Sequence, residues 1–99
     1  MTQLNPKSFE LTGFQRDALY VVAGLTRPSG KRIQEKLTEL GMENVNHGRL
    51  YPNLDTLCEM DLVNKGSQNQ RKNYYALTEQ GAELLESRNE WESNRIRAD

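Results

Sequence analysis

The sequence predicts a mainly helical α+β domain in which three helices are followed by a two-stranded β-hairpin and a long C-terminal helix. Its 99 residues, 35% hydrophobic and 27% charged, fit one small globular domain. Apolar residues recur at helical spacing in three separate segments, and two runs rich in Val and Tyr follow them. This order of elements is that of a winged helix-turn-helix, in which the hairpin is the wing.

The first two helices are predicted from their apolar stripes and end signals. From Phe14 to Leu25, apolar residues recur at i, i+4, i+7, i+8 and i+11. Thr12 and Gln15 form a capping box, in which each side chain satisfies the backbone N–H of the other residue. After a turn at 27–30, a helix of about eleven residues is expected to end at Gly41, which supplies a left-handed conformation. The apolar side of this second helix carries Ile33, Leu37 and Leu40.

The third helix is predicted from an Asn46 N-cap to about Met60. Pro52 lies beyond its first turn, where it removes one backbone hydrogen bond and is expected to bend or loosen the helix start. Cys58 falls on the apolar side, where a small buried side chain is expected rather than a redox-active thiolate. That side carries Leu50, Leu54, Leu57 and Cys58.

Two short strands at 62–65 and 74–77, separated by a polar tip at 66–73, predict the wing. Thr78 then caps the last helix, with Glu79 in its first turn. Residues 1–77 are expected to form the winged helix domain that binds DNA, and residues 78–99 a dimerisation helix packed on the same domain. The predicted dimerisation residues are Leu84, Leu85, Trp91 and Ile96, because Leu77, Leu84 and Trp91 repeat every seven residues. The alternative is that this helix folds back on its own core.

Three motifs carry a family resemblance: NHGRLYPNLDTL at 46–57, DLV at 61–63 and NYYALTEQG at 73–81. They resemble the patterns H-G-x-L-Y-P-x-L-x-x-L, G-L-V and Y-x-L-T-x-x-G of the PadR family of prokaryotic transcriptional regulators, over about residues 11–88. Asp61 departs from the pattern, since the family commonly has Gly there. The stretch 9–17 also resembles members from halophilic archaea. The resemblance implies a repressor of this arrangement, and some such repressors respond to small molecules.

The polar face of the third helix is the predicted reader of DNA bases. Arg suits guanine O6 and N7, Asn suits adenine N6 and N7, and Gly lets the backbone approach closely. The alternatives are a solvated polar face, packing for Tyr51, and a space-filling role for His47. The predicted DNA-binding residues here are Asn46, His47, Gly48, Arg49, Tyr51, Pro52, Asn53 and Thr56.

The wing is the one locally basic segment, because no acidic residue occurs between Asp61 and Glu79. Its predicted contacts to phosphates or the minor groove are Lys65, Gln70, Arg71 and Lys72. Lys31 and Arg32 open the second helix and could touch phosphates or simply be solvated. Asp55 and Glu59 on the third helix could repel phosphates or hold cations between themselves and DNA.

We therefore expect a homodimeric regulator that binds double-stranded DNA, with the third helix in the major groove and the wing on the backbone or minor groove. The rival is a winged-helix module that binds another protein, which the net charge of −1 favours. No catalytic arrangement, metal-ligand spacing or cofactor motif is evident, and one cysteine cannot form an internal disulfide. The N-terminal residues lack a signal-peptide pattern and no stretch suits a membrane span, so a cytoplasmic location is expected.

Overall fold

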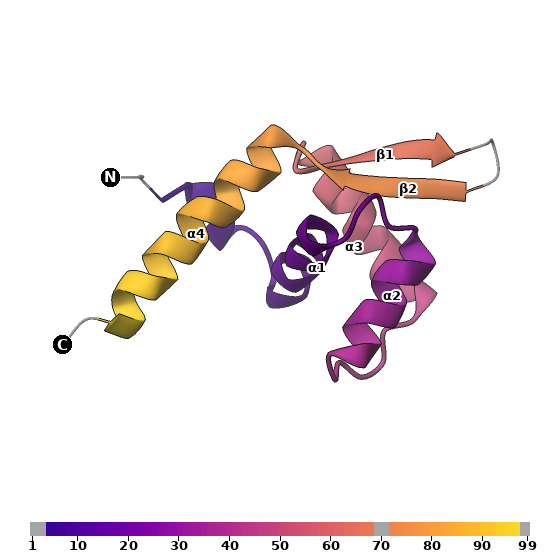
Figure 1. Cartoon of the computed structure of the whole chain (residues 1–99), viewed down its shortest axis with the longest axis horizontal. Helices are drawn as coiled ribbons and strands as arrows, with labels where there is room; N and C mark the ends of the chain where they lie inside the picture. The colour runs from indigo at the N-terminus through magenta and orange to yellow at the C-terminus, as the bar shows by residue number, and fades with distance from the viewer. Residues whose placement is uncertain (1–3, 69–71, 98–99) are drawn as a thin grey trace.

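The structure, a computed structural model, describes residues 4–68 and 72–97. Figure 1 shows α1, α2 and α3 gathered beside an antiparallel hairpin, while α4 runs away from the hairpin along the 49 Å length of the molecule. The mainly helical α+β class and the winged helix-turn-helix are therefore confirmed. In chain order the elements are the 3-10 helix η1 (Pro6–Phe9), α1 (Gly13–Gly24), α2 (Gly30–Glu39), α3 (His47–Glu59), β1 (Val63–Gln68), β2 (Lys72–Leu77) and α4 (Glu79–Arg97).

The helices α1, α2 and α3 all begin with a side chain that accepts a hydrogen bond from the backbone N–H three residues later. The predicted box at α1 is present, with Thr12 Oγ1 3.1 Å from the Gln15 nitrogen and Gln15 Oε1 3.0 Å from the Thr12 nitrogen. Ser29 caps α2 and Asn46 caps α3 in the same way. These caps satisfy N–H groups that have no partner inside the helix, and so determine where each helix starts.

The ends of α2 and α3 share one backbone motif. At α2, Gly41 has φ of +103° and the Met42 N–H donates to the Leu37 carbonyl at 3.0 Å. At α3, Asp61 has φ of +61° and the next N–H donates to the Leu57 carbonyl at 3.0 Å. Asp61 thus adopts the left-handed conformation that a glycine would adopt more easily, so the departure from the family pattern leaves the turn geometry intact.

One core joins the helices to the hairpin. Leu40 is not part of it, contrary to the apolar stripe predicted for the second helix, because it follows α2 and is 66% exposed. Gly81 lets α4 start against this core, since a Cβ there would meet the Leu62 carbonyl oxygen and lie 2.8 Å from Leu77 Cδ1. The largest fully buried side chains include Tyr75, Leu19, Ile33, Leu37, Leu50, Leu54, Leu57, Leu62 and Leu84.

The wing is longer than its sequence predicts. β1 and β2 pair in register from Val63 with Leu77 to Gln68 with Lys72, so most of the expected polar tip at 66–73 is strand. Gly66 lies opposite Tyr74, and a Cβ on it would come within 2.5 to 2.7 Å of the Tyr74 ring. The ring covers the glycine, and this cross-strand packing allows a strand where the local composition indicates a loop.

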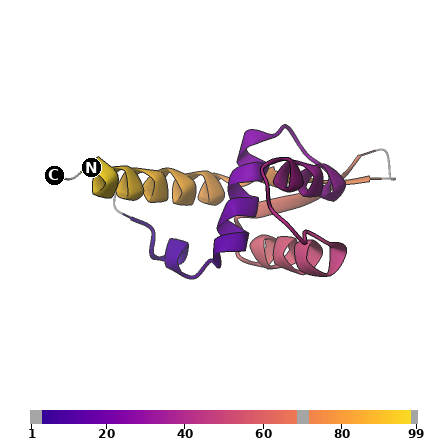
Figure 2. The same ribbon diagram turned by 90° about the horizontal axis from the view of Figure 1, so that it is seen from below.

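The first half of α4 packs on this chain's own core, which corrects part of the predicted dimerisation surface. Leu84 is fully buried and Leu85 is 6% exposed, so neither forms an outward seam in the single chain. Trp91 is half-buried, because η1 lies alongside α4 (Figure 2) and Phe9 meets the Trp91 ring edge to face at 5.7 Å. Ile96 is 84% exposed. Among the described residues, no helix has both the length and the apolar character to cross a bilayer.

Candidate nucleic-acid interface

The predicted reading face of α3 points away from the core. Gly48, Arg49 and Pro52 are exposed, and Asn53 and Thr56 are half-buried. The opposite side of the helix buries three leucines completely. α3 continues through Pro52, which sits past the first turn with an exposed side chain. A helix with one buried and one exposed face is suited to lie in a groove while it stays attached to its domain.

Arg49 is held over an aromatic ring of α1. Its Cζ lies 4.2 Å from the centroid of the Phe14 ring, and its Nη1 donates to the Glu43 carbonyl at 3.4 Å. Within residues 4–68 and 72–97, no carboxylate forms an ion pair with this guanidinium. Stacking restricts the side chain and leaves most of its five N–H donors available to a partner.

Asn53 is connected to α1 by a side chain that the sequence assigns only to capping. Gln15 Nε2 donates to Asn53 Oδ1 at 2.9 Å, and Asn53 Nδ2 donates to the Arg49 carbonyl at 2.6 Å. Thr56 Oγ1 donates to the Pro52 carbonyl at 3.1 Å. Gln15 is thus a residue of the candidate site that local sequence patterns cannot find, because its partner lies 38 residues away.

Tyr51 and His47 are neighbours on α3, and Tyr51 reaches the start of α2. Their rings are 5.0 Å apart between centroids, and Tyr51 lies so close to Gly30 that a Cβ there would be 2.6 Å from the tyrosine Cζ. Asn46 uses its side chain to cap α3. Tyr51 therefore packs, as one of the two sequence-based interpretations has it, and its contact requires a glycine at the first position of α2.

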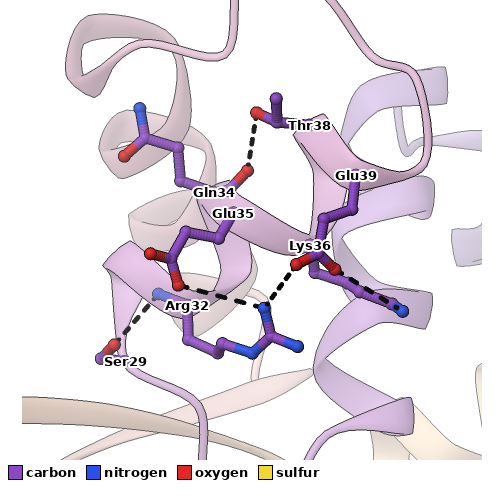
Figure 3. A network of polar contacts seen from close by, with 7 residues as sticks. All are labelled: Ser29, Arg32, Gln34, Glu35, Lys36, Thr38 and Glu39. Carbon is purple, nitrogen blue, oxygen red and sulfur yellow. Dashed lines mark hydrogen bonds and ion pairs between the residues drawn. The ribbon is translucent and has the colours of Figure 1, made fainter.

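The two cations at the start of α2 differ in their surroundings. Arg32 Nη1 lies 3.3 Å from Glu39 Oε1 and 3.9 Å from Glu35 Oε1, and Lys36 pairs with Glu39 at 3.9 Å. Figure 3 shows these side chains along one side of α2. Lys31 is exposed, and no ion pair involves it among the residues that the structure describes. Arg32 would have to leave two carboxylates to reach a phosphate.

The wing brings basic groups and aromatic rings together. Lys65 is exposed on β1, with its Nζ 6.0 Å from the Tyr75 ring centroid. Arg27, which the sequence does not connect with the wing, lies with its Cζ 5.1 Å from the Tyr74 ring centroid. Lys72 stands opposite Gln68 at the end of β2, whereas Gln70 and Arg71 lie outside the described residues.

Tyr75 and Cys58 lie where the wing meets α3, and both are kept in their neutral forms. Burial, and then the Asp55 carboxylate, raise the pKa of Tyr75 to about 12 and also raise the pKa of the Cys58 thiol. Tyr75 is fully buried, and none of the described residues forms a hydrogen bond with its hydroxyl. A raised thiol pKa is the opposite of what a reactive cysteine needs.

Away from α3, a groove of about 560 Å³ lies between α1 and α2, lined mainly by apolar side chains including Tyr20, Leu37 and Leu40. None of its lining residues belongs to α3 or to the wing. In the described part of the chain, no three His, Cys, Asp or Glu side chains come together as metal ligands would.

Comparison with known proteins decides the family. The model of the transcriptional regulator PadR-like family matches residues 19–87. The chain belongs to the PadR-like family. This confirms the resemblance drawn from the three motifs, and it confirms the expectation of a regulator of transcription rather than an enzyme. No protein with a curated description matches the chain.

Solved structures show the same relationship. A complex of the RosR protein, RosR-S1, shares 40% identity and a TM-score of 0.86 over 94% of this chain and 82% of that one. A structure of H. salinarum RosR, described as grown from NaBr, shares 41% identity with a TM-score of 0.83. The match covers 91% of this chain and 81% of that chain. A PadR-like regulator from Bacillus cereus, with 22% identity, a TM-score of 0.68 and coverage of 87% and 93%, shares the fold. The likeness to halophilic members is therefore confirmed.

Proposed function

We propose that this regulator is a repressor that binds a specific DNA sequence as a homodimer, with α3 in the major groove. The observation that carries the proposal is the exposed α3 face, on which Arg49 and Asn53 are both held by contacts to α1. An arginine and an asparagine are the side chains that pair bidentately with guanine and adenine. A protein bound over a promoter would exclude the transcription machinery, which is repression by occupancy.

The wing is the second contact surface in this proposal. Lys65 is a cation of β1, and Arg27 lies against the hairpin over the Tyr74 ring. Arg71 and Lys72 add two more basic residues in the sequence of the wing. These groups suit phosphates or the minor groove, because such contacts need charge more than a fixed hydrogen-bond pattern. A regulator that binds a promoter works where the DNA is, so the proposal includes a cytoplasmic location. The apolar groove between α1 and α2 is the proposed place for a small-molecule inducer.

The homodimer is proposed to form through the second half of α4. Leu84 and Leu85 are buried within the chain, so the exposed Ile96 and the half-buried Trp91 are the apolar groups available to a second copy. A Trp at an interface centre often carries a large part of the binding free energy. Sedimentation should show a dimer at micromolar concentration, and Trp91→Ala should weaken it. A wild-type monomer at that concentration would refute the dimer.

A gel-shift assay with a fragment of the protein's own promoter tests the DNA-binding proposal. The fragment should shift, and a scrambled duplex of equal length should not. The rival function, a module that binds another protein through α3, is favoured by the net charge of −1 and by exposed Asp55 and Glu59 on that helix. Equal and weak binding of both duplexes would favour the rival.

A further inference from the structure

Gln15 connects the cap of α1 to the exposed face of α3 through a continuous chain of hydrogen bonds. Its Oε1 accepts from the Thr12 N–H at 3.0 Å, and its Nε2 donates to Asn53 Oδ1 at 2.9 Å. Asn53 Nδ2 then donates to the Arg49 carbonyl at 2.6 Å. The chain thus begins at a backbone donor of α1 and ends at a backbone acceptor of α3.

The direction of this chain is determined at both ends. The backbone N–H of Thr12 can only donate, and the carbonyl of Arg49 can only accept. An amide that accepts with its oxygen on one side presents its NH₂ group to the next partner. Each of the two side-chain amides therefore has one orientation that satisfies all three hydrogen bonds, and the opposite orientation of Asn53 would place like atoms against each other.

Asn53 retains one acceptor position and one donor hydrogen. A side-chain amide has two of each, and Gln15 and the Arg49 carbonyl use one of each. The side chain is half-buried, so part of it is open at the α3 surface. One acceptor and one donor are the pair that an asparagine uses to bind N6 and N7 of adenine.

We infer that Gln15 is a positioning residue for base recognition, and that it orients the Asn53 amide so that α3 presents a fixed donor–acceptor pair to an adenine. The inference rests on the proposed DNA-binding function and adds a residue of α1 to it. An amide that is ordered before DNA arrives loses less conformational entropy on binding, and it rejects a base whose pattern is reversed.

Gln15→Glu tests this inference because it removes the donor to Asn53 Oδ1 and preserves the capping box with Thr12. Glu at this position accepts from the Thr12 N–H in the capping box as Gln does, so α1 retains its N-terminal hydrogen bonds. A carboxylate cannot donate to Asn53 Oδ1, so the wild-type orientation would place two acceptors together. In the opposite orientation Asn53 Nδ2 donates to the carboxylate, a charge-assisted hydrogen bond that replaces the one to the Arg49 carbonyl. Gly13→Glu is the charge control, since it adds the same charge where a Cβ meets nothing within 4 Å.

The experiment selects bound sites from a pool of random duplexes with the full chain as wild type, Asn53→Ala, Gln15→Glu and Gly13→Glu. Asn53→Ala identifies the base pair that Asn53 reads, because preference there disappears. Gln15→Glu should change the preference at that same pair by about 5- to 150-fold and leave other positions unchanged. Gly13→Glu should retain the wild-type profile.

Two results would overturn the inference, and they are distinguishable. If Gln15→Glu keeps the wild-type preference at the pair that Asn53→Ala identifies, Gln15 does not orient the amide, while base reading by Asn53 stands. If Asn53→Ala itself keeps every preference, the proposed reading of a base by Asn53 fails, and the role of Gln15 fails with it.

Discussion

α2 and α3 are built by the same local rules but use their charged side chains differently. Both begin at a capping side chain and both end in a left-handed residue, Gly41 or Asp61. On α2, Arg32 and Lys36 pair with acidic residues of the same helix. On α3, Arg49 rests on the Phe14 ring, and no carboxylate pairs with it in the described part of the chain. Two of the three cations of α2 are thus paired within the helix, whereas the arginine of α3 is presented to a partner.

This difference determines which helix can bind a charged ligand at low cost. An exposed ion pair contributes about 0.2 to 1 kcal/mol, and a cation that leaves such a pair for a phosphate loses that contribution. Arg49 can keep its stacking on Phe14 while its guanidinium edge binds a base. The number of cations on a helix therefore does not decide its binding surface, since α2 carries three Lys and Arg residues and α3 carries one.

The largest expected effect is on DNA-binding affinity, and it should distinguish Arg49 on α3 from Arg32 on α2 when each is replaced separately. Arg49→Ala should cost about 1 to 3 kcal/mol of binding free energy on the selected site and little on random DNA, and Asn53→Ala should behave alike. Arg32→Ala should change either affinity by at most a few tenths of a kcal/mol, because its guanidinium is already paired. Fluorescence anisotropy on both duplexes measures this. Equal weakening on cognate and random DNA by Arg49→Ala would show that α3 does not read bases.

The glycines near the starts of the two helices give a second contrast. Gly30→Ala should lower the free energy of unfolding by about 1 to 3 kcal/mol, because the new Cβ would press into the Tyr51 ring at 2.6 Å. Gly48→Ala should raise it by up to about 1 kcal/mol, since its Cβ would lie 3.5 Å from Asn46 Oδ1, an ordinary contact. Urea unfolding checks both values. Similar stabilities for the two variants would contradict the packing of Tyr51 on α2.

Tyr75 tests the junction between α3 and the wing. Tyr75→Phe should raise the free energy of unfolding by about 1 kcal/mol at neutral pH, because it removes a buried hydroxyl that lacks a partner among the described residues. The raised pKa of about 12 means that the folded state holds this proton more tightly than the unfolded state. Wild-type stability should therefore fall relative to the Phe variant as pH rises from about 10 to 12. Parallel denaturation curves across this range would contradict the assignment.

The smallest effect is expected from the wing. Arg71→Ala and Lys72→Ala should weaken binding to all DNA alike, and the removal of each phosphate interaction should flatten the slope of log affinity against log salt by about 0.9. A dimer would present each interaction twice. Lys36→Ala is the matched control, because its ammonium pairs with Glu39 on α2. A salt titration that leaves affinity and slope unchanged in the wing variants would exclude the wing from the interface and favour a protein partner.

Local chemistry explains why the helices and their faces were predictable. The capping box at Thr12, the Asn46 cap and the two-sided pattern of α3 depend on residues within about four positions of each other. The sequence predicts too short a wing, because the outer half of the wing depends on Tyr74 covering Gly66 from the opposite strand. The seven-residue repeat in α4 predicts a dimer seam, but Leu84 packs on the core of its own chain, because a local repeat does not show which surface a helix covers.

The sequence by itself determined the order of elements, their ends and the face of α3 that stays polar, because these follow from short-range hydrogen bonds and periodicity. Only the tertiary structure decided that Arg49 lies on Phe14, that Gln15 donates to Asn53 and that Tyr51 requires Gly30. Each of these contacts joins residues from different helices, and their geometry depends on how those helices cross. The candidate site therefore takes its residue types from α3 and their orientation from α1.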